Sequence, residues 1–305
     1  MTVPSILVTG GTGLLGLNYG VTLRDPHRIT LGIHRRTVNM QGVLFKEFPL
    51  DSVDVILRVL DDVQPDYIVH TAGLTSVEVC EEKPDLAHHV NVELAENVAI
   101  ACARRDLKLV HISTDHLFSG DAQFVTEDES VKPINSYART KAEAEKRVGN
   151  ACPDALIIRT NFFGWGTTYR QSFTDTLIGA LRKNQPIRLF DDVYFTPILI
   201  ERLIEVAQKL VLCEAKGVFN VAANDRVSKY EFGVQVASIF GLNEKLIQRV
   251  SIDELSRLVR RPRDMSLSNH KLSAFLELNL GGVNQHLQRL LEQEHSGLSI
   301  ELGKI

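Results

Sequence analysis

The sequence predicts an α/β protein built on a doubly wound parallel sheet, with a smaller lobe in its second half. Two observations lead to this prediction. A glycine-rich turn follows an N-terminal apolar strand, and strand-like and helical segments then alternate through the first 165 residues. A chain of 305 residues can hold one large α/β domain and a small second one. We therefore expect a core domain over 1–165 and a mixed region over 166–305, which returns to the core at about 198–230 and otherwise forms the lobe.

Composition and charge narrow the classes of partner. The formal net charge is −4 and the pI about 6.2, so we expect no broad basic surface that attracts nucleic acid or an anionic membrane. No apolar run reaches the ~18 residues that cross a bilayer, and we expect no signal peptide before the first strand. The four cysteines form no C-x-x-C pair, which is typical of reduced thiols. These observations together predict a cytoplasmic protein.

The stretch Thr9 to Gly16 predicts a turn that binds phosphate. It follows the apolar run Ile6-Leu7-Val8 and has the pattern G-x-x-G-x-x-G. Glycines so placed permit a tight turn, a close approach of backbone N–H groups to a pyrophosphate, and close packing of helix on strand. The helix N-terminus adds unpaired donors. Many such turns use glycine for geometry alone, but the position after the first strand favours nucleotide binding. The expected contacts are Gly10, Thr12, Gly13, Leu14, Leu15 and Gly16.

The end of the second expected strand, Arg28–Ile33, indicates which dinucleotide would bind. At this position an acidic residue suits the ribose of NAD, and an arginine suits the 2′-phosphate of NADP. Here the strand ends in His34-Arg35-Arg36, with two arginines and no acid. A solvated basic loop is the simpler alternative. The place at a strand end favours NADP(H) over NAD(H), with Arg35 and Arg36 as its contacts.

Two further strand ends carry candidate cofactor contacts. Asp51 follows the expected strand Val43–Phe48 and either hydrogen-bonds an adenine amino group or caps the next helix, and the sequence favours neither. Thr71, Ala72 and Gly73 follow the strand Tyr67–His70, where small residues let a cofactor pass close to the backbone. Other expected elements are helices at 53–63, 173–182, 198–212 and 283–294, strands at 108–112, 155–160 and 217–221, and a capping box from Ser228 to Glu231 that begins a helix.

A polar strand end and a helical pair suggest acid–base chemistry. The strand Lys108–Ile112 leads into Ser113-Thr114-Asp115, at the sheet edge where ligands bind. Tyr137 and Lys141 are four residues apart and so lie on one helical face. A tyrosine with a pKa near 10 exchanges protons poorly at neutral pH, but a cation within ~4–6 Å lowers that pKa. Each feature alone is common in helix caps and on solvated helices.

Together and in this order, these motifs resemble the extended short-chain dehydrogenase/reductase superfamily, which has a Rossmann-like core. The stretch His111 to Glu145 resembles more closely the dTDP-4-dehydrorhamnose reductase family. The residues that carry the closer resemblance are Phe118-Ser119-Gly120, Glu127-Asp128-Glu129, Pro133-x-Asn135-x-Tyr137 and Lys141-x-x-x-Glu145, with Pro65-Asp66, Thr71-Ala72-Gly73 and Thr75-x-Val77-Glu78 before them. The resemblance covers the first ~165 residues well and the remainder weakly.

The resemblance implies an NADP-dependent reductase of a keto group on a nucleotide-activated deoxysugar. Tyr137 would protonate the carbonyl oxygen as hydride arrives from the nicotinamide. Lys141 would lower the pKa of Tyr137 and hold the nicotinamide ribose. Thr114 would hydrogen-bond the substrate oxygen. Members of the family are commonly dimers, so the resemblance also allows a homodimer.

Substrate contacts are expected from Thr75, Asp115, Asn161, Trp165 and Arg261. Relatives usually carry a tryptophan nearer the strand than Trp165, whose ring either stacks on substrate or only packs. Arg261 lies in the basic run Arg260–Arg263, which is either a phosphate clamp or a solvated loop. The ten histidines show no metal-ligand spacing, so no metal site is predicted. Some relatives use magnesium at a dimer contact, and nothing in this sequence establishes it.

Two other functions compete with the reductase. One is a nucleotide-sugar epimerase or dehydratase of the same superfamily. Dehydratases usually need additional carboxylates beside the threonine, and here Asp115 is followed by His116, so the acid pair is incomplete. The other is a non-catalytic NADP-binding regulatory subunit. The intact set of Thr114, Tyr137 and Lys141 argues against it.

Overall fold

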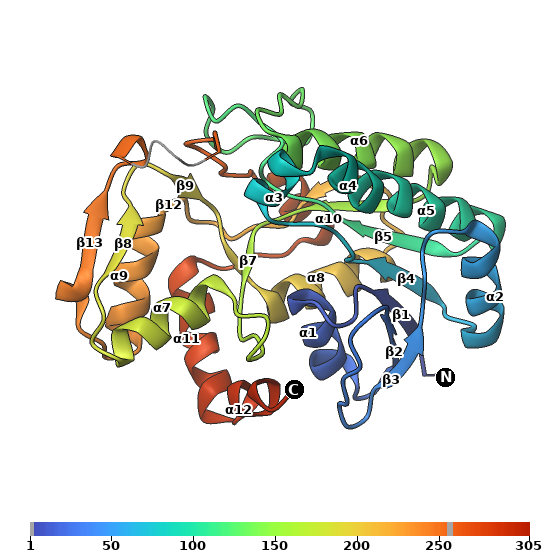
Figure 1. Cartoon of the computed structure of the whole chain (residues 1–305), viewed down its shortest axis with the longest axis horizontal. Helices are drawn as coiled ribbons and strands as arrows, with labels where there is room; N and C mark the ends of the chain where they lie inside the picture. The colour runs from blue at the N-terminus through green and yellow to red at the C-terminus, as the bar shows by residue number, and fades with distance from the viewer. Residues whose placement is uncertain (1–2, 255–258) are drawn as a thin grey trace.

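The computed structural model describes residues 3–254 and 259–305, and its centre is a seven-stranded parallel sheet (Figure 1). Across the sheet the strands follow the order β11-β6-β5-β4-β1-β2-β3, so the chain reverses direction across the sheet between β1 and β4. This is the doubly wound topology that the sequence predicts. The strands are β1 Ser5–Thr9, β2 Arg28–Ile33, β3 Leu44–Glu47, β4 Tyr67–His70, β5 Lys108–Ile112, β6 Leu156–Arg159 and β11 Gly217–Asn220.

Helices cover both faces of this sheet. Successive side chains of a strand point to opposite faces, and here the side chains on both faces are apolar. Ile6 and Val8 of β1 face α1 and α8, whereas Leu7 faces the opposite layer of α2, α5 and α6. In Figure 1 the layer of α5 and α6 lies above the sheet and α1 and α8 lie below it. The helices of the core are α1 Leu14–Leu23, α2 Val53–Val63, α3 Val77–Glu82, α4 Pro84–His88, the π-helical turn η1 His89–Glu93, α5 Leu94–Arg104, α6 Ser136–Ala151 and α8 Ile200–Leu212.

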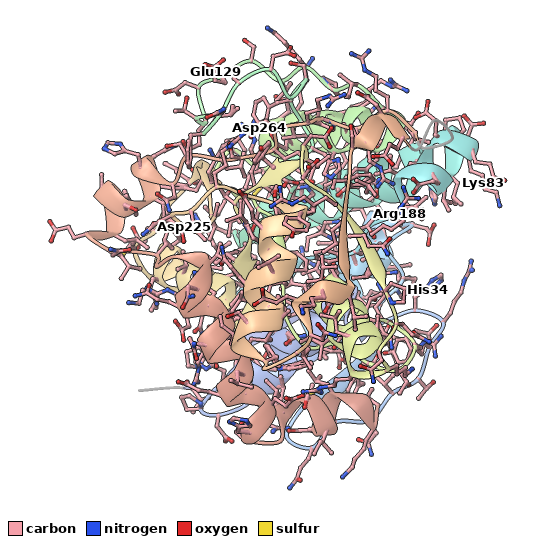
Figure 2. All side chains as sticks on the ribbon, turned by 90° about the vertical axis from the view of Figure 1, so that its left-hand side faces the viewer. His34, Lys83, Glu129, Arg188, Asp225 and Asp264 are labelled. Carbon is pink, nitrogen blue, oxygen red and sulfur yellow. The ribbon has the colours of Figure 1, made fainter. Side chains whose placement is uncertain are left out.

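The second half of the chain contributes to the sheet and also builds a separate group of elements. β11 pairs with β6, so the chain does return to the sheet. Beside the sheet, β8 and β13 pair in parallel and pack against α7 and α9; Figure 2 turns this group toward the viewer. Its elements are α7 Phe173–Arg182, β8 Ile187–Phe190, β9 Tyr194–Phe195, β12 Val227–Ser228, α9 Lys229–Ile239, η2 Glu244–Leu246, β13 Ile247–Val250 and η3 Ile252–Glu254.

The last helices connect this lobe to the sheet. α10 His270–Leu276 packs against β11, and α11 Val283–His295 packs against α9 and α12 Leu298–Gly303. The Arg24 guanidinium, just after α1, pairs with the Glu301 carboxylate of α12. In the part of the chain that the structure describes, no helix is long and apolar enough to cross a bilayer.

One expected helix begins two residues later than its sequence pattern suggests. Ile198 and Leu199 form the short strand β10, which pairs in parallel with β7 Phe162–Phe163, and α8 starts at Ile200. Periodicity alone cannot separate the two states here, because both side chains are fully buried either way. The pairing ties the start of α8 to the loop after β6.

Candidate active site

A cavity of about 640 Å³ lies at the carboxyl ends of the parallel strands, where ligands bind in open α/β sheets. It brings together residues from the glycine turn, the ends of β4, β5 and β6, and helix α6. The expected site residues that line it are Gly10, Thr12, Gly13, Leu14, Leu15, Thr71, Ala72, Gly73, Thr75, Thr114, Asp115, Tyr137, Lys141 and Asn161. Segments that are far apart in the sequence therefore share one pocket.

The glycine turn packs closely against the end of β4 and borders the cavity. Gly10 has a φ of +64°, and a Cβ there would lie 2.8 Å from the Ala72 backbone, so only glycine fits. Gly13 is the N-cap of α1, whose first turn contains no acidic residue. The free N–H groups and positive end of α1 thus face a cavity that suits an anion.

Gly16 has the packing role that the glycine pattern allows. It does not line the cavity, and a Cβ there would lie 2.6 Å from the Gly10 carbonyl oxygen. Its lack of a side chain lets α1 pack against the turn. Gly16 is thus a packing position, and its contact with a cofactor stays a prediction.

Helix α6 presents Tyr137 and Lys141 to the cavity. Its N-cap is Asn135, whose Oδ1 accepts a hydrogen bond from Ala138 N at 2.8 Å and whose Nδ2 donates to the Arg260 carbonyl oxygen at 3.0 Å. Tyr137 is 8% exposed and Lys141 7% exposed. The Lys141 ammonium donates to the Ile112 carbonyl oxygen at 2.8 Å, which ties it to the end of β5.

The protonation states of this pair differ from the sequence-based expectation. Burial raises the pKa of Tyr137 to about 12, the hydrogen bond with Thr114 lowers it, and the charge of Asp115 raises it. Burial lowers the pKa of Lys141 to about 8, against the charge of Glu145. Desolvation thus outweighs any help from the ammonium, and Tyr137 is the protonated phenol at neutral pH.

The segment after β5 carries a buried carboxylate. Asp115 is 1% exposed; its Oδ2 accepts from Asn161 Nδ2 at 2.7 Å and its Oδ1 from Thr114 Oγ1 at 3.3 Å. The His116 backbone N–H donates to Thr114 Oγ1 at 3.3 Å. The carboxylate therefore orients Asn161 and Thr114, and both of them line the cavity.

Besides Gly16, three expected cofactor contacts lie outside the cavity lining. Arg35 is exposed beyond β2. The Arg36 guanidinium carbon lies 3.9 Å from the ring centroid of Tyr169, whose hydroxyl donates to the Thr12 carbonyl oxygen at 3.1 Å. Asp51 Oδ1 accepts from His89 Nε2 at 3.2 Å. The N-cap of α2 is Ser52 and not Asp51. The helix-cap alternative for Asp51 is thus wrong.

Two expected substrate contacts also lie outside the lining. Trp165 is 5% exposed, donates from Nε1 to the Leu290 carbonyl oxygen at 3.1 Å, and meets the Phe240 ring edge to face. It is a packing residue, because its polar and apolar groups both face the protein interior. Arg261 forms an ion pair with Glu78 of α3, which fixes it near the rim of the site.

Sequence reasoning missed several residues at the site. Phe162 and Phe173 supply aromatic surface to the cavity, and the guanidinium of Arg170 donates to Thr75 Oγ1 at 2.9 Å. Phe162 directly follows Asn161, so its place at a strand end was a usable signal. Lys229, the first residue of α9, lies with its ammonium 3.2 Å from the Phe195 ring centroid, and burial lowers its pKa to about 8. No local pattern marks that position, because the chain reaches it only through the fold.

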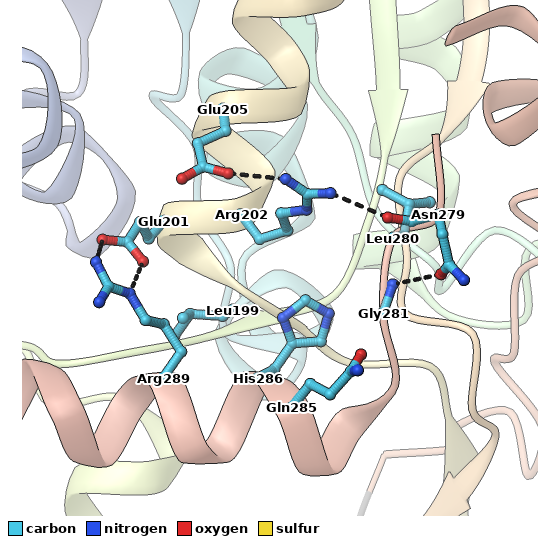
Figure 3. Close-up of a pocket in the computed structure, with 10 residues that line it drawn as sticks. All are labelled: Leu199, Glu201, Arg202, Glu205, Asn279, Leu280, Gly281, Gln285, His286 and Arg289. Carbon is cyan, nitrogen blue, oxygen red and sulfur yellow. Dashed lines mark hydrogen bonds and ion pairs between the residues drawn. The ribbon is translucent and has the colours of Figure 1, made fainter. Parts of the chain in front are cut away.

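A second cavity, of about 500 Å³, lies between α8, the segment before α11 and α11 itself (Figure 3). Its charged groups pair with one another: Arg289 donates to both Glu201 oxygens at 2.7 and 3.0 Å, and Arg202 donates to Glu205 at 2.9 Å. Of the site residues that the sequence predicts, all of which the structure describes, none lines this second cavity. We therefore place the candidate active site in the first cavity.

Among residues 3–254 and 259–305, no three His, Cys, Asp or Glu side chains gather as metal ligands. The buried histidines of the sheet instead stack on each other: the rings of His70 and His111 lie 5.4 Å apart between centroids. His70 Nδ1 shares a hydrogen bond of 2.9 Å with Thr9 Oγ1. These side chains belong to the core beneath the site.

Comparison with known proteins gives one family and several relatives of similar length. A family model described as the RmlD substrate binding domain matches residues 4–296. The probable low-salt glycan biosynthesis reductase Agl14 of Haloferax volcanii is 28% identical, over 84% of this chain and 87% of the relative. The dTDP-4-dehydrorhamnose reductase of Aggregatibacter actinomycetemcomitans is 25% identical, over 88% and 91%. Methionine adenosyltransferase 2 subunit beta of Mus musculus is 26% identical, over 89% and 83%.

Solved structures show the same fold. The crystal structure of dTDP-4-dehydrorhamnose reductase from Bacillus anthracis in complex with NADP superposes with a TM-score of 0.82, at 23% identity, over 96% of this chain and all of that one. At this identity the likeness supports the fold alone.

Proposed function

The chain belongs to the RmlD substrate-binding-domain family, whose members include sugar-nucleotide oxidoreductases of the extended short-chain dehydrogenase/reductase superfamily, and from this premise we propose that it is an NADP-dependent reductase. Its substrate would be a keto group on a nucleotide-activated deoxysugar. The observation that carries the proposal is the convergence of Thr114, Tyr137 and Lys141 on the cavity that also contains the glycine turn. Acid–base and phosphate-binding groups thus face one volume.

The glycines of this cavity and the N-terminus of α1 support a dinucleotide cofactor at this place. Gly10, Thr12 and Gly13 would hold the pyrophosphate, and Lys141 the nicotinamide ribose. The bound nicotinamide supplies the hydride. The Tyr137 phenol, which its raised pKa keeps protonated, then gives its proton to the substrate oxygen, because a sugar alkoxide is a much stronger base than a phenolate. Thr114 orients that oxygen.

The proposed substrate contacts are Asp115, Asn161 and Thr75, together with the rings of Phe162 and Phe173. Asp115 holds the Asn161 amide and the Thr114 hydroxyl in place. Arg261, from the loop after residue 258, would meet a phosphate of the nucleotide at the rim, after exchanging its partner Glu78. The aromatic rings offer apolar surface to the deoxysugar or the base.

The experiment is an assay of NADPH oxidation with dTDP-4-dehydrorhamnose and related keto-sugar nucleotides, followed by absorbance of the reduced nicotinamide. We expect substrate-dependent oxidation by the wild-type protein. Tyr137→Phe removes the proton donor and keeps the ring, so turnover should fall by ~10²–10⁴-fold while NADPH binding, measured by fluorescence titration, stays nearly unchanged. A Tyr137→Phe variant with full turnover would contradict the mechanism.

A regulatory subunit is the second candidate, because the mouse relative of 26% identity is named as the beta subunit of a methionine adenosyltransferase. Such a protein would bind NADP(H) without turning over keto-sugar nucleotides. The same assay separates the two. Absorbance that stays flat with every nucleotide keto-sugar, in a protein that binds NADPH, would favour the regulatory subunit.

A further inference from the structure

His116 is a buried imidazole that the reductase mechanism does not use. It lines the cavity that contains Tyr137, and the two rings meet edge to face with their centroids 5.6 Å apart. Its Nε2 lies 4.0 Å from Asp115 Oδ1, and its side chain is 17% exposed. Nδ1 is buried and has no hydrogen-bond partner among the described residues. A side chain that has one proton-accepting nitrogen in its neutral form therefore lies beside the proposed proton donor.

Burial keeps the ring of His116 neutral at neutral pH. Burial lowers the pKa of His116, the cations Lys229 and Arg261 lower it further, and only Asp115 raises it. Tyr137, the other titratable group in contact, is itself uncharged at neutral pH. A neutral imidazole can accept a proton, and the adjacent Asp115 carboxylate would stabilise the imidazolium that results.

We propose that His116, with Asp115 beside it, is a general base that removes a proton from the carbon next to the keto group of the bound sugar nucleotide. The inference rests on the proposed function, because it needs a ketone held by Thr114 and Tyr137. It adds an activity: exchange of that proton with solvent and, where the proton returns to the other face, epimerisation at that carbon.

The step balances without an added reactant. The C–H bond breaks, its proton goes to an imidazole nitrogen of His116, and its electron pair forms the carbon–carbon double bond of an enol. The carbonyl oxygen takes the developing charge and is stabilised by the hydroxyl groups of Tyr137 and Thr114. In the reverse step the carbon takes a proton from the imidazolium. Nothing is oxidised or reduced, so the hydride step remains separate.

The test uses the full chain with NADP⁺, which supplies no hydride, and dTDP-4-dehydrorhamnose in deuterated buffer. Deuterium that enters the sugar is followed by mass spectrometry and by the loss of the adjacent proton signal in NMR. We expect incorporation at least ~100-fold faster than without protein, in line with one well-placed general base. NADPH oxidation by the same preparation in a separate assay reports the proposed function.

Two substitutions of His116 remove the proton-accepting imidazole and keep a side chain of similar size or shape. His116→Gln keeps a polar side chain of similar size that accepts no proton at neutral pH, and His116→Phe keeps a ring against Tyr137. The readout is the ratio of exchange to reduction for each variant, since a role in packing alone would lower both rates together. We expect this ratio to fall ~100-fold in both variants. His295→Phe, at an exposed position at the end of α11, is the matched control and should leave the ratio unchanged.

The outcomes separate the two claims. Reduction without exchange above the protein-free rate overturns the role of His116 and leaves the reductase standing. Exchange that persists at the wild-type ratio in His116→Gln also overturns it. Exchange without any NADPH oxidation overturns the proposed reductase and supports the role of the imidazole.

Discussion

At the scale of single residues, Tyr137 shows how burial sets the protonation state of a side chain. The phenol is almost fully enclosed, and the cost of placing a phenolate there exceeds what nearby hydrogen bonds return, so its pKa rises to about 12. The four-residue spacing from Lys141 predicts a shared helical face, which the structure has. It does not predict that the ammonium binds the Ile112 carbonyl oxygen, because that partner lies on another element.

Arg35 provides the residue-scale prediction about the cofactor. It is exposed at the end of β2, where an arginine suits the 2′-phosphate of NADP. Arg35→Ala should weaken NADPH binding by roughly tenfold or more, the scale of one charge-assisted contact, and should change NADH binding far less. Titration of both cofactors by fluorescence or calorimetry checks this, with Arg58→Ala at an exposed position of helix α2 as the control. Equal losses for the two cofactors would remove the 2′-phosphate assignment.

At the scale of elements, a capping box fixes where helix α9 of the lobe begins. The sequence predicts a capping box from Ser228 to Glu231, and the structure confirms it: Glu231 N donates to Ser228 Oγ at 3.0 Å and Ser228 N donates to Glu231 Oε2 at 2.7 Å. Because Lys229 is the next residue, the cap also sets the direction in which its ammonium leaves the helix. Local sequence predicts the cap, and only the tertiary fold brings it near Asp115 and His116.

Removal of this cap is the element-scale prediction. Ser228→Ala should lower the free energy of unfolding by about 1 kcal/mol, because an N–H group at the start of α9 loses its partner in a buried setting. Urea denaturation measures the change. Ser273→Ala, inside α10, should stay within about 0.5 kcal/mol of the wild type. Equal effects at the two serines would show that the box contributes nothing measurable.

At the scale of the whole molecule, buried histidines couple folding to pH. Burial lowers the pKa of His70 to about 3, that of His286 to about 4, and that of His111 well below its ordinary value. The unfolded chain takes up these protons near pH 6.5, whereas the folded chain does not. Stability is therefore retained above pH 6.5 and declines as the pH falls toward the folded values.

His286 allows this coupling to be tested away from the site, in the second cavity (Figure 3). One such histidine contributes about 1.4 kcal/mol per pH unit to the slope between pH 6.5 and the folded value. His286→Leu should reduce by about that amount the slope of unfolding free energy against pH between 6 and 4.5, measured by urea denaturation. The exposed His270→Leu serves as control. If His286→Leu keeps the wild-type slope, the imidazole of His286 titrates normally in the fold.

The sequence by itself determined the doubly wound sheet, the glycine turn and the order of the motifs, because these depend on local rules: apolar periodicity, glycine conformations and helix caps. Thr114, Tyr137 and Lys141 could be selected from spacing and family resemblance. Only the tertiary structure decided which side chains share the cavity. In the tertiary structure Trp165 lies in the core and Gly16 packs against the glycine turn. His116 and Lys229 lie near the site. Those outcomes depend on contacts between distant segments, whose burial and charge no local pattern records.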